Sequence, residues 1–116
     1  MDQKRQERLD KFQSSRQEPV RLAIALEEFF FQEGSDEASA VYETYLKRRL
    51  RPAVAALIDR EDIRPLEAMR RFGWLGLQQI DDGIAHARQN GRTVALIWLL
   101  GVKAAEFGWR DRDFTL

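Results

Sequence analysis

The residues with the clearest potential for chemistry are His86 and the two acids before it, Asp81 and Asp82. Positions four apart share a face of a helix, so Asp82 and His86 could orient a general base or contribute to a metal site. One histidine and two aspartates form a thin ligand set, and an ordinary pair on a helix surface accounts for the same spacing. No Ser–His–Asp grouping, phosphate-binding loop or HExxH pattern occurs in the sequence. We therefore predict no catalytic residue, metal site or cofactor, and a protein that is not an enzyme.

Basic and acidic residues are segregated along the chain. Residues 47–71 carry eight bases against four acids, and the densest run is Lys47-Arg48-Arg49-Leu50-Arg51. Residues 27–43 carry six acids and no base. An exposed basic surface would attract phosphates or an acidic protein, and salt would weaken that attraction. The alternative is that the acidic segment packs beside the basic one and neutralises it.

Aromatic residues form a second candidate surface. Consecutive helical positions point about 100° apart, so the rings of the Phe29–Phe31 run cannot all face one core. Trp74 follows a glycine in a predicted loop. Exposed aromatic side chains often anchor a partner protein or a second copy of the chain. The alternative is that an N-terminal arm covers the phenylalanines through Leu9 and Phe12.

These two surfaces supply the predicted contacts with a macromolecular partner. The residues are Phe29, Phe30, Phe31, Trp74, Arg48, Arg49, Arg51, Arg70 and Arg71. A protein partner is the leading hypothesis, and nucleic acid bound by the basic patch of residues 47–71 is the alternative.

The composition sets limits on the class of protein. The chain has 116 residues, with 19 bases, 19 acids and no cysteine. This length suits one modest core, and the charge balance removes the simplest argument for a general nucleic-acid or membrane binder. No apolar run approaches the roughly 18 residues that a transmembrane helix needs, and the polar N-terminus lacks the apolar core of a signal peptide. We expect a single cytoplasmic domain without membrane contact.

Apolar spacing predicts an all-α fold of antiparallel helix pairs, with five or six helices in a compact bundle or a short solenoid. Residues 1–17 are expected to form a marginal helix or arm. Pro19 suits a helix start, and Gly34 followed by Ser35 suits a stop and a new cap. Pro52 predicts a kink or fresh start near residue 50.

The second half of the chain shows the sharper signals. Gly73 and the Asn90-Gly91 pair suit helix ends. The segment from Thr93 to about Phe107 is apolar on nearly every side, which predicts a central, buried helix. Residues 109–116 are expected to form an extended tail that docks partly on that helix.

The stretch from Ala87 to Ala104 resembles the second half of an ankyrin repeat. The matching features are Ala87, the inter-helix Gly91, the Leu99-Leu100 pair and Ala104. The resemblance covers one clear unit, residues 80–107, and one degenerate unit, residues 50–73, superposed with an offset of 31. The opening Thr-Pro-Leu-His motif of a standard repeat falls on Asp82-Gly83-Ile84-Ala85 and is missing. A divergent ankyrin-like helix pair implies a protein-binding scaffold without catalytic activity, and a homo-oligomer is compatible with that role.

Overall fold

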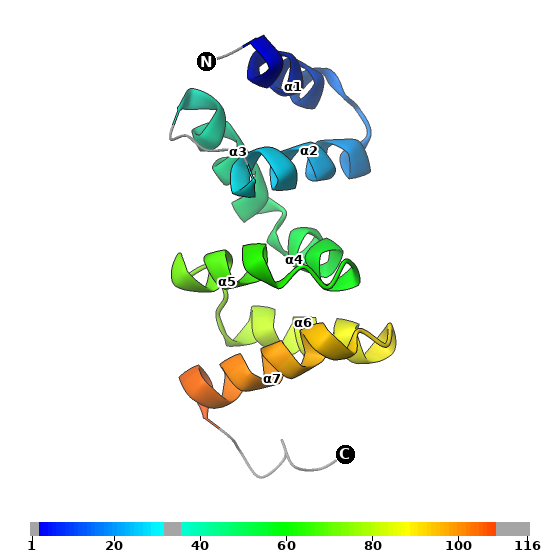
Figure 1. The fold of residues 1–116 in the computed structure, drawn as a ribbon, viewed down its shortest axis with the longest axis vertical. Helices are drawn as coiled ribbons and strands as arrows, with labels where there is room; N and C mark the ends of the chain where they lie inside the picture. Colours follow the sequence, from blue (N-terminus) through cyan, green and yellow to red (C-terminus); the bar gives the residue numbers. More distant parts are fainter. Residues whose placement is uncertain (1–2, 32–35, 109–116) are drawn as a thin grey trace. The chain divides into compact units, whose positions relative to one another are not determined.

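The computed structural model describes residues 3–31 and 36–108, and within them the chain folds into seven α-helices and no strand (Figure 1). The helices are α1 (Gln3–Ser14), α2 (Glu18–Phe30), α3 (Glu37–Arg48), α4 (Leu50–Asp59), α5 (Ile63–Arg71), α6 (Leu77–Gln89) and α7 (Thr93–Phe107). The all-α prediction is confirmed. The chain divides into two compact units, Met1–Ala53 and Val54–Leu116.

The helix count exceeds the expected five or six because the N-terminal segment is a full helix. Leu9 and Phe12 of α1 are buried, and so is Arg5. The Phe12 ring packs edge-on against Tyr42 at 5.1 Å and Tyr45 at 4.9 Å between ring centroids. Phe12, which was considered as a cover for the phenylalanine run, thus contacts two tyrosines of α3. These ring contacts hold α1 in place.

Arg5 joins the three helices of the first unit. Its Nε and Nη2 donate to the two carboxylate oxygens of Asp36, at 2.7 and 3.0 Å. Nη2 also donates to Ser39 Oγ, and Nη1 donates to the backbone carbonyl of Glu28 in α2. Asp36 is the N-cap of α3, where its carboxylate accepts the Ser39 backbone N–H at 3.0 Å. The helix start was expected one residue earlier, at Ser35, which lies outside the described residues together with Gly34.

The junction of α3 and α4 follows the prediction made from Pro52. α3 ends at Arg48, Arg49 forms a turn, and α4 begins at Leu50. Proline is tolerated in the first turn of a helix, where its missing N–H has no intrahelical acceptor. The fresh start near residue 50 is therefore confirmed.

The second unit closes three of its helices with the same hydrogen-bond pattern. At the ends of α4, α5 and α6 a backbone N–H reaches the carbonyl five residues earlier: Asp62 to Leu57, Trp74 to Met69, and Arg92 to Ala87. This is the Schellman closure, which needs a residue in the left-handed conformation. That residue is Glu61 (φ 51°), Gly73 (φ 78°) or Gly91 (φ 66°). The predicted stops at Gly73 and Gly91 are confirmed.

One turn and several buried positions of the second unit recur after 30 residues. Val54, Leu57, Pro65 and Met69 are buried, and so are the residues 30 positions later, Ile84, Ala87, Ala95 and Leu99. The offset of 31 chosen from the sequence pairs buried Leu66 with exposed Ile97 and is wrong by one residue. Helix pair α4–α5 and helix pair α6–α7 are therefore equivalent in register.

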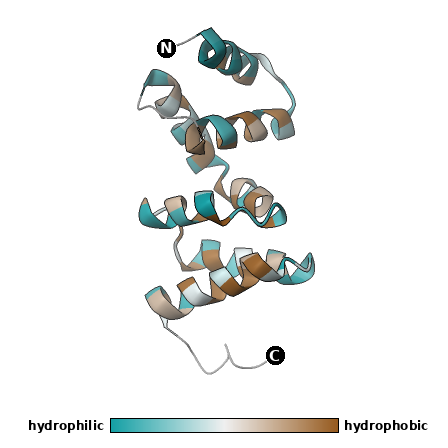
Figure 2. Ribbon diagram, viewed as in Figure 1, coloured by the Kyte–Doolittle hydropathy of each residue, from teal (hydrophilic) through white to brown (hydrophobic). Residues whose placement is uncertain are grey.

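Helix α7 differs from the buried helix that its composition predicts. It runs antiparallel beside α6 (Figure 1), and Ala95, Leu99 and Val102 are buried. Its opposite face is open, with Val94 57% and Ile97 67% exposed. The helix is brown over most of its length in Figure 2. The predicted tail, residues 109–116, lies outside the described residues.

Candidate functional site

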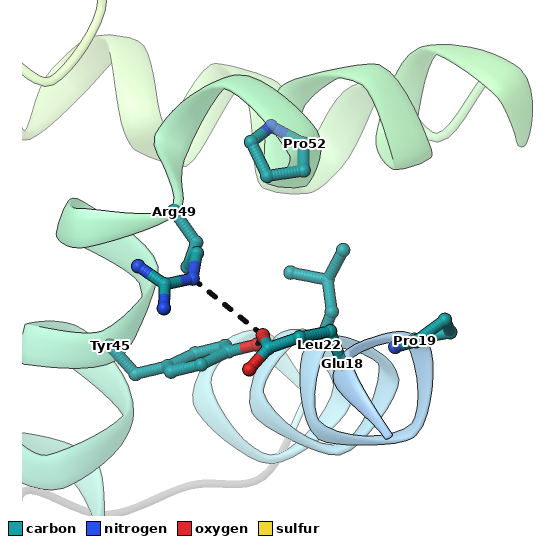
Figure 3. Close-up of a pocket in the computed structure, with 6 residues that line it drawn as sticks. All are labelled: Glu18, Pro19, Leu22, Tyr45, Arg49 and Pro52. Carbon is teal, nitrogen blue, oxygen red and sulfur yellow. Dashed lines mark hydrogen bonds and ion pairs between the residues drawn. The ribbon is translucent and has the colours of Figure 1, made fainter. Parts of the chain in front are cut away.

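The first unit contains a pocket of about 320 Å³ between α2 and the junction of α3 with α4 (Figure 3). Its lining residues are Glu18, Pro19, Leu22, Tyr45, Arg49 and Pro52. Two prolines, a leucine and the face of a tyrosine ring give it apolar walls. This volume falls at the lower end of the range of small-ligand pockets and suits one large side chain.

Local sequence explains how the pocket is formed. Pro19 lies in the first turn of α2 and Pro52 in the first turn of α4, so each ring stands at a helix start and has no N–H that needs a partner. Leu22 follows Pro19 by three positions and lies on the same side of α2. In Figure 3 the Leu22 side chain points into the space below Pro52. The two helix-start prolines therefore line the pocket from two different helices.

Polar groups along one side of the pocket are bound to each other. The Tyr45 hydroxyl donates to Glu18 Oε2 at 2.7 Å, and Arg49 Nε lies 3.6 Å from the same oxygen. The Arg21 guanidinium lies against two rings that contact each other, 4.8 Å from the Phe12 centroid and 5.0 Å from that of Tyr45. These contacts fix the position of the Tyr45 ring.

The same contacts determine the protonation states. The hydrogen bond from Tyr45 lowers the pKa of Glu18, and the charges of Arg49 and Arg21 lower it further. Burial raises the pKa of Tyr45 to about 12, and the hydrogen bond to Glu18 adds to this effect. At neutral pH the carboxyl is ionised and the phenol is protonated. Both pKa values lie far from neutrality, whereas a general acid or base works best with a pKa near the operating pH. This pair is suited to binding.

The predicted arginines of the first unit surround the α3–α4 junction. Arg48, Arg49 and Arg51 are all exposed, and Arg49 also lines the pocket. The acidic segment neutralises the run only in part. Glu43 lies 3.6 Å from Lys47, and the carboxylate beside Arg49 is Glu18, which is outside the acidic segment. An apolar pocket and a basic surface therefore adjoin at this junction.

The predicted phenylalanine surface lies elsewhere. Phe29 and Phe30 are half-buried, with their rings edge-on at 4.9 Å, and Phe31 is 46% exposed. They end α2, whereas the pocket lies at its start. With a rise of about 1.5 Å per residue, the two ends are roughly 16 Å apart. The structure does not bring the phenylalanine run and the arginine cluster into one site.

The other predicted contact residues belong to the second unit. Trp74 is half-buried, and its ring centroid lies 5.4 Å from that of Phe72. Arg70 binds two carboxylates, Glu67 at 2.8 Å and Glu106 at 2.7 Å. Arg71 is exposed. Because its carboxylate partners hold it, Arg70 is less suited to partner contact than Arg71.

His86 pairs with a different aspartate from the one expected. Its Nε2 lies 2.8 Å from Asp59 Oδ1 at the end of α4, while Asp82 accepts from Gln78 on its own helix. Arg92 also lies 3.5 Å from Asp59. The histidine thus links α6 to α4 at a helix end. Over residues 3–31 and 36–108 no group of three or more potential metal-ligating side chains is gathered.

Comparison with known protein families, curated proteins and solved structures found no match to this chain. Among the described helices, none has the length and apolar character needed to cross a membrane.

Sequence reasoning identified Arg49 but missed the pocket beside it. Pro19 and Pro52 were interpreted only as helix boundaries, and Tyr45 was not singled out. Two prolines at helix starts 33 positions apart give no signal that they line the same pocket. The pairing of Glu18 with Tyr45 spans 27 residues and depends on the crossing of α2 and α3.

Proposed function

We propose that this protein is a non-enzymatic interaction module that binds an acidic segment of a partner protein at the α3–α4 junction. The observation that carries the proposal is the pocket with apolar walls next to three exposed arginines, Arg48, Arg49 and Arg51. The pocket would take one large apolar side chain, and the arginines would pair with the carboxylates that flank it. Buried apolar anchors with a charged rim are typical of protein interfaces.

Nucleic acid is the second candidate, because exposed arginines also bind phosphates. The pocket favours the protein partner, since a phosphate backbone makes no use of walls formed by two prolines and a leucine. The overall charge balance of 19 bases and 19 acids supports the same choice. A cytoplasmic location fits this role and the cysteine-free composition.

Selection from a random peptide-display library on the purified protein tests the proposal. We expect the enriched peptides to combine several acidic residues with one large apolar residue. Their binding, measured by fluorescence anisotropy, should weaken as salt rises. Leu22→Asp and Arg49→Gln should each weaken it by about 10-fold or more, and Lys4→Gln, at an exposed position of α1, should leave it unchanged.

Three outcomes would contradict the proposal. They are enrichment of neutral or basic peptides, equal binding by wild type and by both pocket variants, and tighter binding of duplex DNA or single-stranded RNA than of the selected peptides. Circular dichroism of each variant shows whether the helices are retained. Arg49 is exposed, so its variant keeps the test valid if Leu22→Asp disturbs the fold.

A further inference from the structure

The exposed face of α7 consists of Val94, Ile97, Gly101 and Ala105. Their spacings of three, four and four residues place them on one side of the helix, opposite buried Ala95, Leu99 and Val102. No charged residue occurs between Thr93 and Val102. An apolar face of this kind usually marks a contact surface.

Helix α5 provides an internal comparison. In the 30-residue register, Val94, Ile97 and Gly101 are equivalent to Arg64, Glu67 and Arg71 of α5. Arg64 and Arg71 are exposed and Glu67 is partly exposed. In Figure 2 α5 alternates between teal and brown, whereas α7 is largely brown. The exposed face is therefore polar on α5 of the first helix pair and apolar on α7 of the second.

Gly101 supports the same interpretation. Glycine is disfavoured inside a helix relative to alanine unless packing requires it. At Gly83 packing favours it, because an added Cβ would lie only 3.2 Å from Ile58 Cδ1 and 3.3 Å from Leu99 Cδ2. At Gly101 an added Cβ would meet nothing within 4 Å. Within residues 3–31 and 36–108 no contact explains this glycine, whereas a second helix approaching closely would.

We infer that α7 packs against α7 of a second copy of the chain, antiparallel and crossing between Ile97 and Gly101. The large residues of the face lie in its first half and the small ones in its second half. Reversing the second copy places each Ile97 opposite Gly101, and each Val94 opposite Ala105. Large against small at facing positions fills space without overlap. A face without charge also avoids the repulsion that a charged surface would meet in its own copy.

The expected dimer is weak. A helix of 15 residues is about 22 Å long, and one of its faces covers far less than the roughly 800 Å² per partner of a stable interface. Association should therefore depend on concentration in the micromolar range. The twofold arrangement uses the same patch on both copies, so it closes at two chains.

Sedimentation velocity from low micromolar to near-millimolar concentration tests the inference. We expect a monomer–dimer equilibrium whose dissociation constant rises at least about 10-fold in Gly101→Glu and in Ile97→Glu. Ala85→Glu, at an exposed position of α6, should leave it unchanged. The Gly101 variant keeps the test valid because its Cβ meets no neighbour and the monomer should fold normally.

Disulfide trapping tests the orientation, because the chain has no native cysteine. An antiparallel pair predicts that Ile97→Cys mixed with Gly101→Cys forms the mixed disulfide in preference to either symmetric one. Preference for both symmetric disulfides would overturn the antiparallel arrangement.

A monomer at all concentrations, or a dimer that neither Glu variant weakens, would overturn the inference. So would a wild type that dimerises only after truncation at Gly108, since residues 109–116 would then cover the face.

Discussion

In the first unit three helices meet at Arg5, a buried guanidinium, whereas in the second unit three helices meet at Gly83. Arg5 is 7% exposed and donates to the carbonyl of Glu28 and to the side chains of Asp36 and Ser39. Gly83 lies between Ile58 of α4 and Leu99 of α7. One junction depends on directed polar bonds and the other on close apolar packing. The two should respond to different perturbations, which the following predictions test.

Arg5→Met should produce the largest loss of stability. The methionine keeps an apolar stem, but it removes the positive charge that Arg5 places beside buried Glu28 and beside Asp36, the N-cap of α3. Breaking a buried ion pair in this way costs about 3 kcal/mol of unfolding free energy. Urea unfolding followed by far-UV circular dichroism measures the loss. Lys4→Met, at the exposed neighbouring position, should change it by less than about 0.5 kcal/mol.

Tryptophan fluorescence makes this first prediction specific to one unit. All three tryptophans follow residue 53, so their emission reports on the second unit. We expect Arg5→Met to shift the fluorescence transition less than the circular dichroism transition. Equal shifts would show that the two units unfold as one.

Gly83→Leu should reduce stability by about 2 kcal/mol, because the core has no room for the added side chain. Gly101→Ala is the matched control. Its Cβ meets nothing, so we expect a gain of roughly 0.5–1 kcal/mol from helix propensity, measured at a concentration where the protein is monomeric. For Gly83→Leu the fluorescence transition should shift more than the circular dichroism transition. A tolerated Gly83→Leu would contradict the assignment of Gly83 as the packing centre.

Acid should weaken the first unit through Asp36. The hydrogen bond from Arg5 and the Ser39 N–H hold the pKa of Asp36 well below its ordinary 3.8. A lowered pKa adds stability that is complete above about pH 4 and is lost as the pH falls toward the folded-state pKa. The effect should be smaller than that of Arg5→Met, because protonated Asp36 leaves the bonds from Arg5 to the α2 carbonyl and Ser39 in place. In unfolding measured against pH, Asp36→Asn should lack this acid-dependent loss, and an unchanged slope would contradict the assignment.

Tyr42→Phe should have the smallest effect. The Tyr42 side chain is fully buried, and its hydroxyl has no hydrogen-bond partner among the described residues. Burial accordingly raises the pKa of this phenol. Removing a buried, unpaired hydroxyl should raise the free energy of unfolding by about 0.5 kcal/mol. A decrease of more than about 1 kcal/mol in urea unfolding would indicate a hydrogen bond to that hydroxyl.

The same comparison explains which parts of the fold the sequence could predict. The ends of α5 and α6 follow from Gly73 and Gly91, and Thr93 begins α7 as expected, because these signals act within a few residues. The role of Arg5 could not be predicted, since its partner Asp36 is 31 positions away and a polar residue in a polar segment resembles a solvent-facing one. The exposed face of α7 was missed because an apolar sequence does not distinguish a fully buried helix from a helix with one exposed apolar face.

The candidate site likewise has one part that the sequence predicts and one part that it does not. The arginine run is visible in the sequence as a local concentration of charge. The pocket beside it depends on how α2 crosses the α3–α4 junction, which no local pattern encodes. The contact of His86 with Asp59 could not be predicted for the same reason, since Asp59 lies on another helix.

The division of the chain at Ala53 has a consequence for its synthesis. The hydrogen-bond partners of Arg5 described above and the Tyr42 ring beneath it all precede residue 43, and the residues that line the pocket end at Pro52. Domains generally fold as units, N-terminal first, as the ribosome releases them. The first unit can thus acquire its buried arginine and its pocket while the second is still being translated. Under the proposed function, a nascent chain would then be able to bind a peptide before its synthesis is finished.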